Sequence, residues 1–427
     1  MDNPADIGVS TDLAVLGLGY VGLQLARAAS RSGLAVIGLD IDTATVADLN
    51  AGRSCIGSVS DDDVRDMIAA GFSASLDEDV LADAAVIAIC VPTPLSIEDE
   101  PDLSPVVAAT DAIARHLREE QIVVLESTTY PGTTDEVVRP ILEKTGLKAG
   151  VDFHLAYSPE RVDPGNPDYG IANTPKVVGG HTSRCTELAA AFYRRFVDTV
   201  VECSGTREAE MTKLLENTYR HVNIALVNEM AQVCHEMDID FWEVIRHAST
   251  KPFGFQAFHP GPGVGGHCIP IDPTYLTYKV RSLLGRPLQL VEVAETINRH
   301  MPAYIVARIT ALLNLDSKPL HGSRILLLGV TYKRDVADQR GSPAPVLAEL
   351  LIEAGADVWF HDPHVSTWFV DGREVRRADE LQQALSAADV TILLQDHREY
   401  ELDAVESHAR RLFDTRGVTR DPLIARL

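Results

Sequence analysis

The stretch Leu13-Ala-Val-Leu-Gly-Leu-Gly-Tyr-Val-Gly22 is the part of the sequence that decides the fold. Its apolar run predicts a buried strand, and its three glycines predict a tight turn that opens a helix. In this pattern the first glycine permits the turn, the second admits a pyrophosphate, and the third allows close helix packing. Because a helix N-terminus offers unpaired N–H groups to phosphates, we expect a dinucleotide to bind at Gly17, Gly19, Tyr20, Val21 and Gly22.

Asp40 ends the next apolar run, 18 positions after Gly22. A carboxylate at this point accepts hydrogen bonds from both ribose hydroxyls and repels a 2′-phosphate, so NAD is favoured over NADP. Asp42 is the alternative ribose partner. Thr93 and Thr128 follow two later apolar runs, and ligands of parallel sheets lie beyond the carboxyl ends of strands. These hydroxyls fit cofactor contacts and ordinary turn chemistry about equally well.

Strand-length apolar runs alternate with helical segments in both halves of the chain, which predicts parallel sheets covered by helices on both faces. The first half has such runs at 84–91 and 122–125, and a second α/β unit begins near residue 323. Uninterrupted helical segments fill much of the region between them. The fold class we expect is α/β, with two Rossmann-like doubly wound domains joined by a long central helical region. The expected boundaries are 1–205, 206–315 and 316–427.

Composition excludes several classes of function. The net charge of −24 argues against nucleic-acid binding, which needs a positive field. No run of 18 apolar residues appears, so we expect no membrane span, and the first residues show no secretory signal. The six cysteines are scattered without the pairing of a zinc site, so we expect no metal and a reducing, cytoplasmic location.

The segment Gly263-Val-Gly-Gly-His-Cys-Ile-Pro-Ile-Asp272 places a cysteine in a glycine-dense turn. Glycines let a ligand approach the main chain, so Cys268 is expected to be accessible and reactive. A free thiol titrates near ~8.5, and Lys213 or His267 would favour the thiolate. Asp272 is placed to assist water or to orient the lysine. The competing interpretation is a structural cysteine in a turn.

A stripe of polar side chains runs along the predicted helix from about 208. The polar residues are Lys213, Asn217, Arg220 and Asn228, and with Ile224 before Asn228 the five positions share one face at steps of four, three, four and four. An ammonium and an amide one turn apart suit the stabilisation of an oxyanion. The alternative is the solvent-facing side of an amphipathic helix.

Two charged loops are weaker candidates. Ser158-Pro-Glu160-Arg161 places a carboxylate that fits general acid–base work, although from these residues alone a solvated charged loop is the favoured interpretation. Lys333 and Arg340 follow the first strand of the second unit, where diphosphates bind in such sheets. A surface charge cluster is the alternative.

These motifs, in this order along nearly the whole chain, resemble those of the UDP-glucose/GDP-mannose dehydrogenase family. The resemblance rests on Gly-Leu-Gly-Tyr-Val-Gly at 17–22, Ser-Pro-Glu at 158–160, Lys-Leu-Leu-Glu-Asn at 213–217, Gly-Gly-His-Cys at 265–268, and the Lys and Arg at 333 and 340. It implies NAD in the first domain, a UDP-sugar bound with the help of the C-terminal domain, and a homodimer or higher oligomer formed through the central helix.

The resemblance also implies roles for single residues. Cys268 would be the nucleophile, Lys213 and Asn217 would hold the oxyanion, and Asp272 and Glu160 would assist hydrolysis of a thioester. NAD would contact Thr93, Thr128 and Arg340 in addition to the glycine turn and Asp40. The sugar nucleotide would contact Glu160, Arg161, Lys213, Asn217, Gly265 and Lys333.

Two departures from the UDP-glucose enzymes narrow the range of substrates that we expect. Ile271 stands where those enzymes usually have lysine, and Arg161 follows Glu160 where they usually have an aromatic residue. Both features resemble the branch that oxidises UDP-N-acetylhexosamines, with N-acetylglucosamine ahead of N-acetylmannosamine. The implied reaction is a four-electron oxidation of C6 to the uronate. The alternatives are a UDP-glucose dehydrogenase, a two-electron dehydrogenase of the 6-phosphogluconate type, and a non-catalytic sugar-nucleotide sensor.

Overall fold

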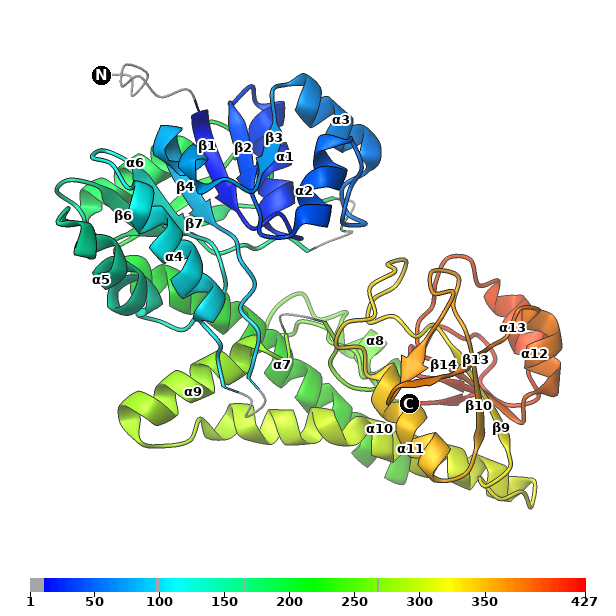
Figure 1. The fold of residues 1–427 in the computed structure, drawn as a ribbon. Helices are drawn as coiled ribbons and strands as arrows, with labels where there is room; N and C mark the ends of the chain where they lie inside the picture. Colours follow the sequence, from blue (N-terminus) through cyan, green and yellow to red (C-terminus); the bar gives the residue numbers. More distant parts are fainter. Residues whose placement is uncertain (1–10, 97–99, 164–165, 167, 267–268) are drawn as a thin grey trace. The chain divides into compact units, whose positions relative to one another are not determined.

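The computed structural model describes residues 11–96, 100–163, 166, 168–266 and 269–427, which form two compact units (Figure 1). Unit 1 comprises residues 1–216 and 274–285, and unit 2 comprises residues 217–273 and 286–427. Helices α7 (Thr206–Glu236) and α9 (Asp272–Leu284) each contribute residues to both units. The domain boundaries expected at 205/206 and 315/316 remain a prediction.

Unit 1 is built on one eight-stranded sheet with the order β3-β2-β1-β4-β5-β6-β7-β8. Neighbouring strands are parallel, except that β7 runs antiparallel to β6, a reversal that the sequence did not predict. The strands are β1 (Thr11–Leu16), β2 (Val36–Leu39), β3 (Ser73–Ser75), β4 (Ala84–Ile89), β5 (Ile122–Leu125), β6 (His154–Tyr157), β7 (Lys176–Gly180) and β8 (Val200–Cys203).

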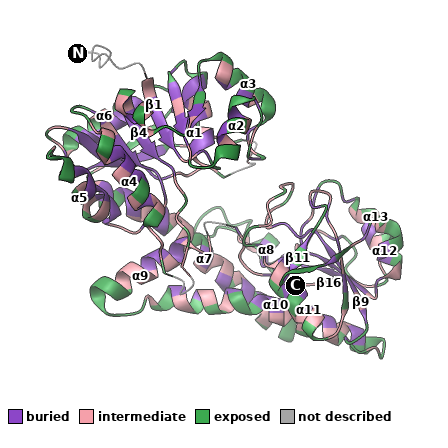
Figure 2. Cartoon of the chain, viewed as in Figure 1, coloured by how far each residue is buried: buried purple, intermediate pink, exposed green. Residues whose placement is uncertain are grey.

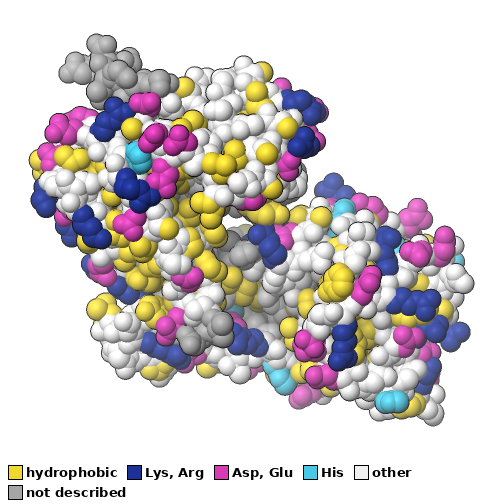
Figure 3. Space-filling view, in the orientation of Figure 1, with side chains coloured by type: hydrophobic (Ala, Val, Ile, Leu, Met, Phe, Trp, Pro, Cys, Tyr) yellow, Lys and Arg dark blue, Asp and Glu magenta, His cyan; other side chains and the backbone are white. Residues whose placement is uncertain are grey.

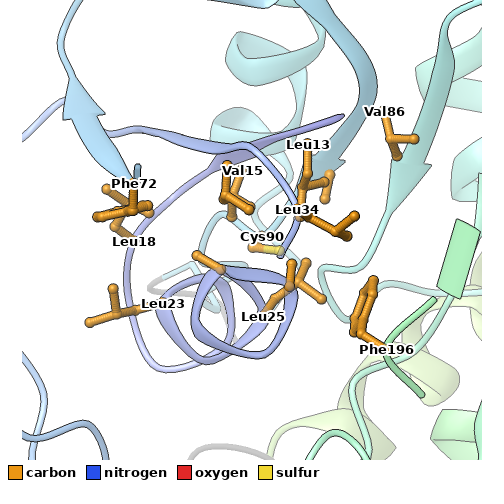
Figure 4. Close-up of a cluster of buried hydrophobic side chains, with 14 of the residues drawn as sticks. Leu13, Val15, Leu18, Leu23, Leu25, Leu34, Phe72, Val86, Cys90 and Phe196 are labelled. Atoms are coloured by element: carbon orange, nitrogen blue, oxygen red, sulfur yellow. The ribbon is translucent and has the colours of Figure 1, made fainter. Parts of the chain in front are cut away.

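Helices cover both faces of this sheet (Figure 1). Alternate residues of β1 point into two separate apolar clusters, because a strand directs successive side chains to opposite faces. Leu13 and Val15 pack with Leu23 and Leu25 of the first helix (Figure 4). The helices are α1 (Gly22–Arg31), α2 (Thr43–Asn50), α3 (Asp61–Ala69), α4 (Ser104–His116), α5 (Arg139–Leu142) and α6 (Ser183–Tyr193), with shorter turns η2 (Glu78–Asp83), η3 (Thr134–Val138) and η4 (Glu143–Thr145).

Unit 2 contains a six-stranded parallel sheet with the order β13-β10-β9-β14-β15-β16. The strands are β9 (Arg324–Leu328), β10 (Asp357–His361), β13 (Arg376–Arg377), β14 (Val390–Leu393), β15 (Leu412–Asp414) and β16 (Ala425–Arg426), with a small hairpin of β11 (Phe369–Val370) and β12 (Arg373–Glu374). Its helices are α8 (Phe241–Ala248), α10 (Gln289–Leu315), α11 (Ala344–Glu353), α12 (Leu381–Ala387) and α13 (Leu402–His408).

The expected fold class is confirmed by these two parallel-sheet units and the long helices α7 and α10. Buried residues are concentrated in the sheets and on the helix faces that cover them (Figure 2). On the face drawn in Figure 3, Lys and Arg side chains are interspersed with Asp and Glu. Among the described helices, none combines the length and the apolar character that crossing a bilayer requires.

Candidate active site

The glycine turn after β1 has three glycines with three different steric environments. Gly17 has φ +89°, and a Cβ there would lie 2.8 Å from the carbonyl oxygen of Cys90. A Cβ on Gly22 would lie 1.9 Å from the carbonyl oxygen of Gly17, so a side chain is excluded where α1 begins. A Cβ on Gly19 would meet nothing within 4 Å. The protein therefore requires glycine at 17 and 22 for its own packing, while Gly19 leaves open space that fits an approaching pyrophosphate.

The two candidate ribose carboxylates have different surroundings. Asp40 lies at the carboxyl end of β2 and accepts the Leu18 N–H at 2.7 Å through Oδ2. Asp42 instead caps α2, accepting from the N–H of Ala44 at 3.3 Å and of Thr45 at 3.0 Å. The hydroxyl of Thr45 donates a further hydrogen bond to Asp42, and these bonds lower the pKa of the Asp42 carboxyl. Because Asp42 is committed to the helix cap, the geometry favours Asp40 as the ribose partner.

The two threonine loops lie beside each other at the carboxyl edge of the first sheet. Ser127, next to Thr128, donates its hydroxyl to the carbonyl oxygen of Val91 at 2.7 Å and so joins the loop after β5 to the loop after β4. Thr93 is held from another direction, because the Tyr275 hydroxyl donates to its carbonyl oxygen at 2.6 Å. Tyr275 was missed by sequence reasoning, since nothing in its local sequence connects it to a loop 182 residues away.

Lys213 and Glu160 are brought together within unit 1. The Lys213 ammonium donates to the carbonyl oxygen of Glu160 at 2.7 Å, and the side chain is buried. Among the described residues, no carboxylate forms an ion pair with Lys213. The Lys213 side chain is thus held in a fixed direction by the main chain, as a preorganised hydrogen-bond donor must be.

Arg161 is already paired in this structure. Its Nη2 lies 2.7 Å from Glu216 Oε1 on α7, and its Nη1 donates to the carbonyl oxygen of Pro175 at 2.5 Å. The neighbouring Glu160 carboxylate accepts the N–H of Val162 at 2.5 Å. The charged loop is therefore an ordered structure fixed to α7 and not a freely solvated segment.

A buried polar cluster lies next to this loop and was not anticipated. Glu126, at the end of β5, is 1% exposed and forms an ion pair with Lys176 at 2.9 Å. The hydroxyl of Tyr193 donates to the same carboxylate. Burial raises the pKa of Glu126, because the buried Lys176 offsets only part of its desolvation. The clue in the sequence is a carboxylate placed directly after an apolar strand, a position that usually faces a ligand edge.

Asn217 and Asp272 are brought together within unit 2. The Asn217 amide donates to Asp272 Oδ2 at 2.5 Å, and Asp272 is 2% exposed at the first turn of α9. Cys268 and His267 lie outside the described residues. Asp272, four residues after the predicted nucleophile in the sequence, is among the described residues.

The glycines that precede Cys268 pack against the loop after β9. A Cβ on Gly265 would lie 2.9 Å from the carbonyl oxygen of Gly341, and a Cβ on Gly266 would lie 3.0 Å from the ring of Tyr332. The N–H of Gly266 donates to the Gly341 carbonyl at 3.3 Å. Because Lys333 follows Tyr332 in the chain, the loop that leads to Cys268 and the loop that carries Lys333 are in contact within unit 2.

Arg340 forms an ion pair with Asp338 in its own loop, with Nη2 2.6 Å from Oδ2.

Asp335, His364 and His397 place possible metal-ligating atoms within 4.8 Å of one another in the described part of unit 2. Both ring nitrogens of His397 are engaged, since Nδ1 accepts the Asp335 N–H at 2.9 Å and Nε2 lies 3.2 Å from Asp362 Oδ2. These contacts describe a hydrogen-bonded network that holds the loop after β9.

Three family models match successive parts of the chain. They are described as the NAD binding, central and UDP binding domains of the UDP-glucose/GDP-mannose dehydrogenase family, and they match residues 11–197, 207–300 and 326–421.

Curated relatives and solved structures agree with these models. A UDP-N-acetyl-D-glucosamine 6-dehydrogenase of Pseudomonas aeruginosa is 36% identical over 83% of each chain. An NDP-N-acetyl-D-galactosaminuronic acid dehydrogenase of Ralstonia nicotianae is 34% identical over 98% of each chain. The solved UDP-D-ManNAc dehydrogenase of Pyrococcus horikoshii superimposes with a TM-score of 0.87 at 32% identity, covering 97% of this chain and 98% of that one. The chain therefore belongs to the UDP-glucose/GDP-mannose dehydrogenase family and is an NAD-dependent oxidoreductase.

Proposed function

We propose that this enzyme oxidises the C6 alcohol of a UDP-N-acetylhexosamine, with UDP-N-acetylglucosamine as the first candidate, to the uronate in a four-electron reaction. The observation that carries the proposal is the buried Lys213 ammonium, whose hydrogen-bond partner is the neutral carbonyl oxygen of Glu160. Relatives named for the N-acetylglucosamine, N-acetylmannosamine and N-acetylgalactosaminuronic acid substrates support the N-acetylhexosamine class. Mannosamine and glucose substrates remain the alternatives.

The cofactor would be held at the glycine turn, with the pyrophosphate over Gly19 and the ribose at Asp40. Tyr20 and Val21 would contact it from the turn, Thr93 and Thr128 from the neighbouring loops, and Arg340 from unit 2. When bound, NAD⁺ accepts a hydride from C6 in each of the two oxidations. The open space at Gly19 and the engagement of Asp42 elsewhere support this assignment.

Covalent chemistry at Cys268 would keep the aldehyde on the enzyme. After the first oxidation, the Cys268 thiolate adds to the aldehyde carbon and forms a thiohemiacetal oxyanion. The Lys213 ammonium and the Asn217 amide, one helical turn apart, donate to this oxygen, and such donors are typically worth ~10²–10³ in rate. Loss of the second hydride leaves a thioester.

Hydrolysis of the thioester completes the reaction. Water attacks the thioester carbonyl, Glu160 takes a proton from the water, and the Cys268 thiolate leaves as the uronate forms. Asp272, whose carboxylate accepts a hydrogen bond from Asn217, would orient the amide and assist the water. The sugar nucleotide itself would contact Arg161, Gly265 and Lys333 in addition to these catalytic groups.

A homodimer through α7 is part of the proposal. Tyr219, Leu226, Met230 and Val233 on α7, with Met237 just beyond its end, are all between 38% and 63% exposed. At ~100° per residue they fall within a band of about 60° on the helix surface. An exposed apolar stripe of this kind is typical of a helix that packs against a second copy.

We place the enzyme in the cytoplasm, on the ground that the five described cysteines are free thiols.

The test is a panel of UDP-sugars followed by NADH absorbance, with NADH counted per sugar consumed. Two NADH per uronate support the proposal, whereas one NADH supports a two-electron dehydrogenase. Ligand-induced stabilisation without any NADH would support a non-catalytic sensor. Cys268→Ser should lose net formation of acid, and a trapped sugar–Cys268 adduct should be detectable by mass spectrometry. Uronate formation by Cys268→Ser at the parent rate would contradict covalent catalysis.

A further inference from the structure

We infer that Asn228 and Asn298 form a buried amide clamp that positions the loop carrying Cys268, and that α7 holds this loop at both ends. The inference rests on the proposed function, in which Cys268 must reach C6 of the sugar. It concerns positioning residues, because the two amides bond each other and the main chain of neighbouring segments.

The clamp joins three segments of unit 2. Asn228 of α7 donates from Nδ2 to Asn298 Oδ1 of α10 at 2.9 Å, and its Oδ1 accepts the Gly261 N–H at 2.9 Å. Asn298 in turn donates from Nδ2 to the carbonyl oxygen of His221 at 3.3 Å. Each amide therefore donates one hydrogen bond and accepts another, and this pattern fixes the orientation of both side chains.

Burial makes this arrangement costly to rearrange. Asn228 is 0% exposed, Asn298 is 4% exposed, and Gly261 is buried. A buried amide that loses its hydrogen-bond partners leaves its polar atoms desolvated and unsatisfied, so other side-chain orientations are higher in free energy. Asparagine is also a weak helix former, and both residues lie inside long helices. Neither side chain is explained by helix stability or by apolar packing.

The second attachment lies at the other end of the loop. Asn217, 11 residues before Asn228 on α7, donates to Asp272 at 2.5 Å. Eleven residues correspond to about three turns, so the two amides share one face of α7 about 16 Å apart along its axis. Gly261 precedes Cys268 by seven residues and Asp272 follows it by four. One helix face therefore fixes both ends of the segment 261–272.

Glycine packing restricts the loop between these attachments. Gly263 has φ +134°, and a Cβ there would lie 3.4 Å from the carbonyl oxygen of Asn298 and 3.3 Å from Pro343. Gly265 and Gly266 lie against the loop after β9, as described above. The described residues on both sides of Cys268 are therefore held by α7 and by the loop after β9, and covalent catalysis requires a positioned nucleophile.

The decisive experiment compares Asn228→Ala with Asn223→Ala, a matched asparagine on the same helix. Asn223 donates to the carbonyl oxygen of Tyr219 within α7, and its side chain bonds no other segment among the described residues. We expect Asn228→Ala to lower kcat for uronate formation by about tenfold to hundredfold, since displacing a reacting group by about 1 Å costs about that much. KM for the sugar nucleotide should change less than about threefold, and Asn223→Ala should match the parent enzyme.

Hydrogen exchange followed by mass spectrometry supplies a readout that does not depend on activity. Peptides covering 261–266 should exchange at least about tenfold faster in Asn228→Ala, because the Gly261 N–H loses its acceptor. Should Asn228→Ala fail to fold, Asn298→Ala takes its place, since it removes the anchor of Asn228 and leaves the bond to Gly261. A folded variant with parent exchange and parent kcat would overturn the clamp.

Failure of the proposed function would be recognised separately. If the parent protein oxidises none of the UDP-sugars, the function is wrong, and the exchange comparison still decides whether Asn228 holds the loop. If the parent oxidises a UDP-sugar, and hydrogen exchange of 261–266 in Asn228→Ala is the same as in the control Asn223→Ala, the proposed function stands and the clamp is wrong.

Discussion

The sheets of unit 1 and unit 2 have the same Gly–Asp arrangement at the end of their first strand, with different outcomes. In unit 1, Gly17 follows β1, and the N–H of the next residue donates to Asp40 at 2.7 Å. In unit 2, Gly329 follows β9 with φ +77°, and the N–H of the next residue donates to Asp362 at 2.7 Å. Both carboxylates come directly after the second strand of their sheet.

The two carboxylates differ in burial and in the number of partners. Asp40 is partly exposed, and it accepts hydrogen bonds from the backbone N–H groups of Leu18 and Asp42. Asp362 is 0% exposed and accepts from Val330, from the N–H of His364 at 2.8 Å, and from His397. Burial opposes ionisation of Asp362, but these hydrogen bonds outweigh it, and the pKa of the carboxyl lies below its usual value.

The difference shows that strand order alone does not produce the glycine turn and accessible carboxylate of a dinucleotide site. In unit 1 the glycines at 17, 19 and 22 lead directly into α1, and the carboxylate stays accessible to a ligand. In unit 2 a loop from 329 to 343 intervenes before α11, and Asp362 is used to hold the base of that loop. Lys333 and Arg340, the residues predicted to contact the ligands, belong to this intervening loop.

The largest effect should come from filling the tightest glycine of unit 1. Gly22→Ala places a Cβ 1.9 Å from the Gly17 carbonyl oxygen and should abolish NAD binding and lower Tm strongly. Gly19→Ala meets no atom within 4 Å, so it should keep the parent Tm while NAD affinity falls at least about tenfold. Thermal unfolding and NAD titration measure both. An equal decrease in Tm in the two variants would contradict the inference that Gly22 is required for packing and Gly19 for access of the ligand.

The next effect concerns the buried carboxylate of unit 2. Asp362→Asn removes a charged acceptor from three donors and should cost about 2 kcal/mol of stability at neutral pH. Because the folded pKa of Asp362 is lowered, its stabilising contribution is present above the unfolded pKa and is lost as pH falls through the folded value. The difference between Asp362→Asn and the parent should therefore shrink below about pH 4. Denaturant unfolding across pH measures this, and a difference independent of pH would contradict the assignment.

Asp40→Asn should have the complementary effect. Stability should change by less than about 1 kcal/mol, because one of its acceptor oxygens remains for the Leu18 N–H. NAD affinity should fall about tenfold, and the preference for NAD over NADP should weaken, since the charge that repels a 2′-phosphate is gone. Titration with each dinucleotide tests this. If Asp40→Asn left the preference for NAD over NADP unchanged, Asp40 would not be the residue that binds the ribose.

The smallest effect is expected at Asp42. Asp42→Ser keeps a side-chain oxygen for the cap of α2, so NAD affinity should change less than about twofold. The same dinucleotide titration measures it. If Asp42→Ser weakened NAD binding more than Asp40→Asn did, the two carboxylates would have to exchange roles.

Much of this molecule could be predicted from local sequence. The apolar runs at 84–91 and 122–125 lie on β4 and β5, and the helix expected from about 208 begins at Thr206. Hydrophobic periodicity and glycine spacing are local properties, so they predicted the two α/β units and the dinucleotide turn. The reversal of β7 was not predictable in this way, because strand direction depends on which strand lies beside it.

The site divides along the same line. Lys213, Asn217 and Cys268 were predicted as site residues from residue type and spacing, which are properties of the sequence itself. Only the tertiary structure decided that Asn217 bonds Asp272, 55 residues away, and that Asn228 bonds Asn298, 70 residues away. The tertiary structure also decided that Asp362 is buried, whereas Asp40, at the equivalent position in unit 1, is partly exposed. These outcomes depend on contacts between distant segments, and a hydrogen bond or a burial penalty exists only once folding has brought those segments together.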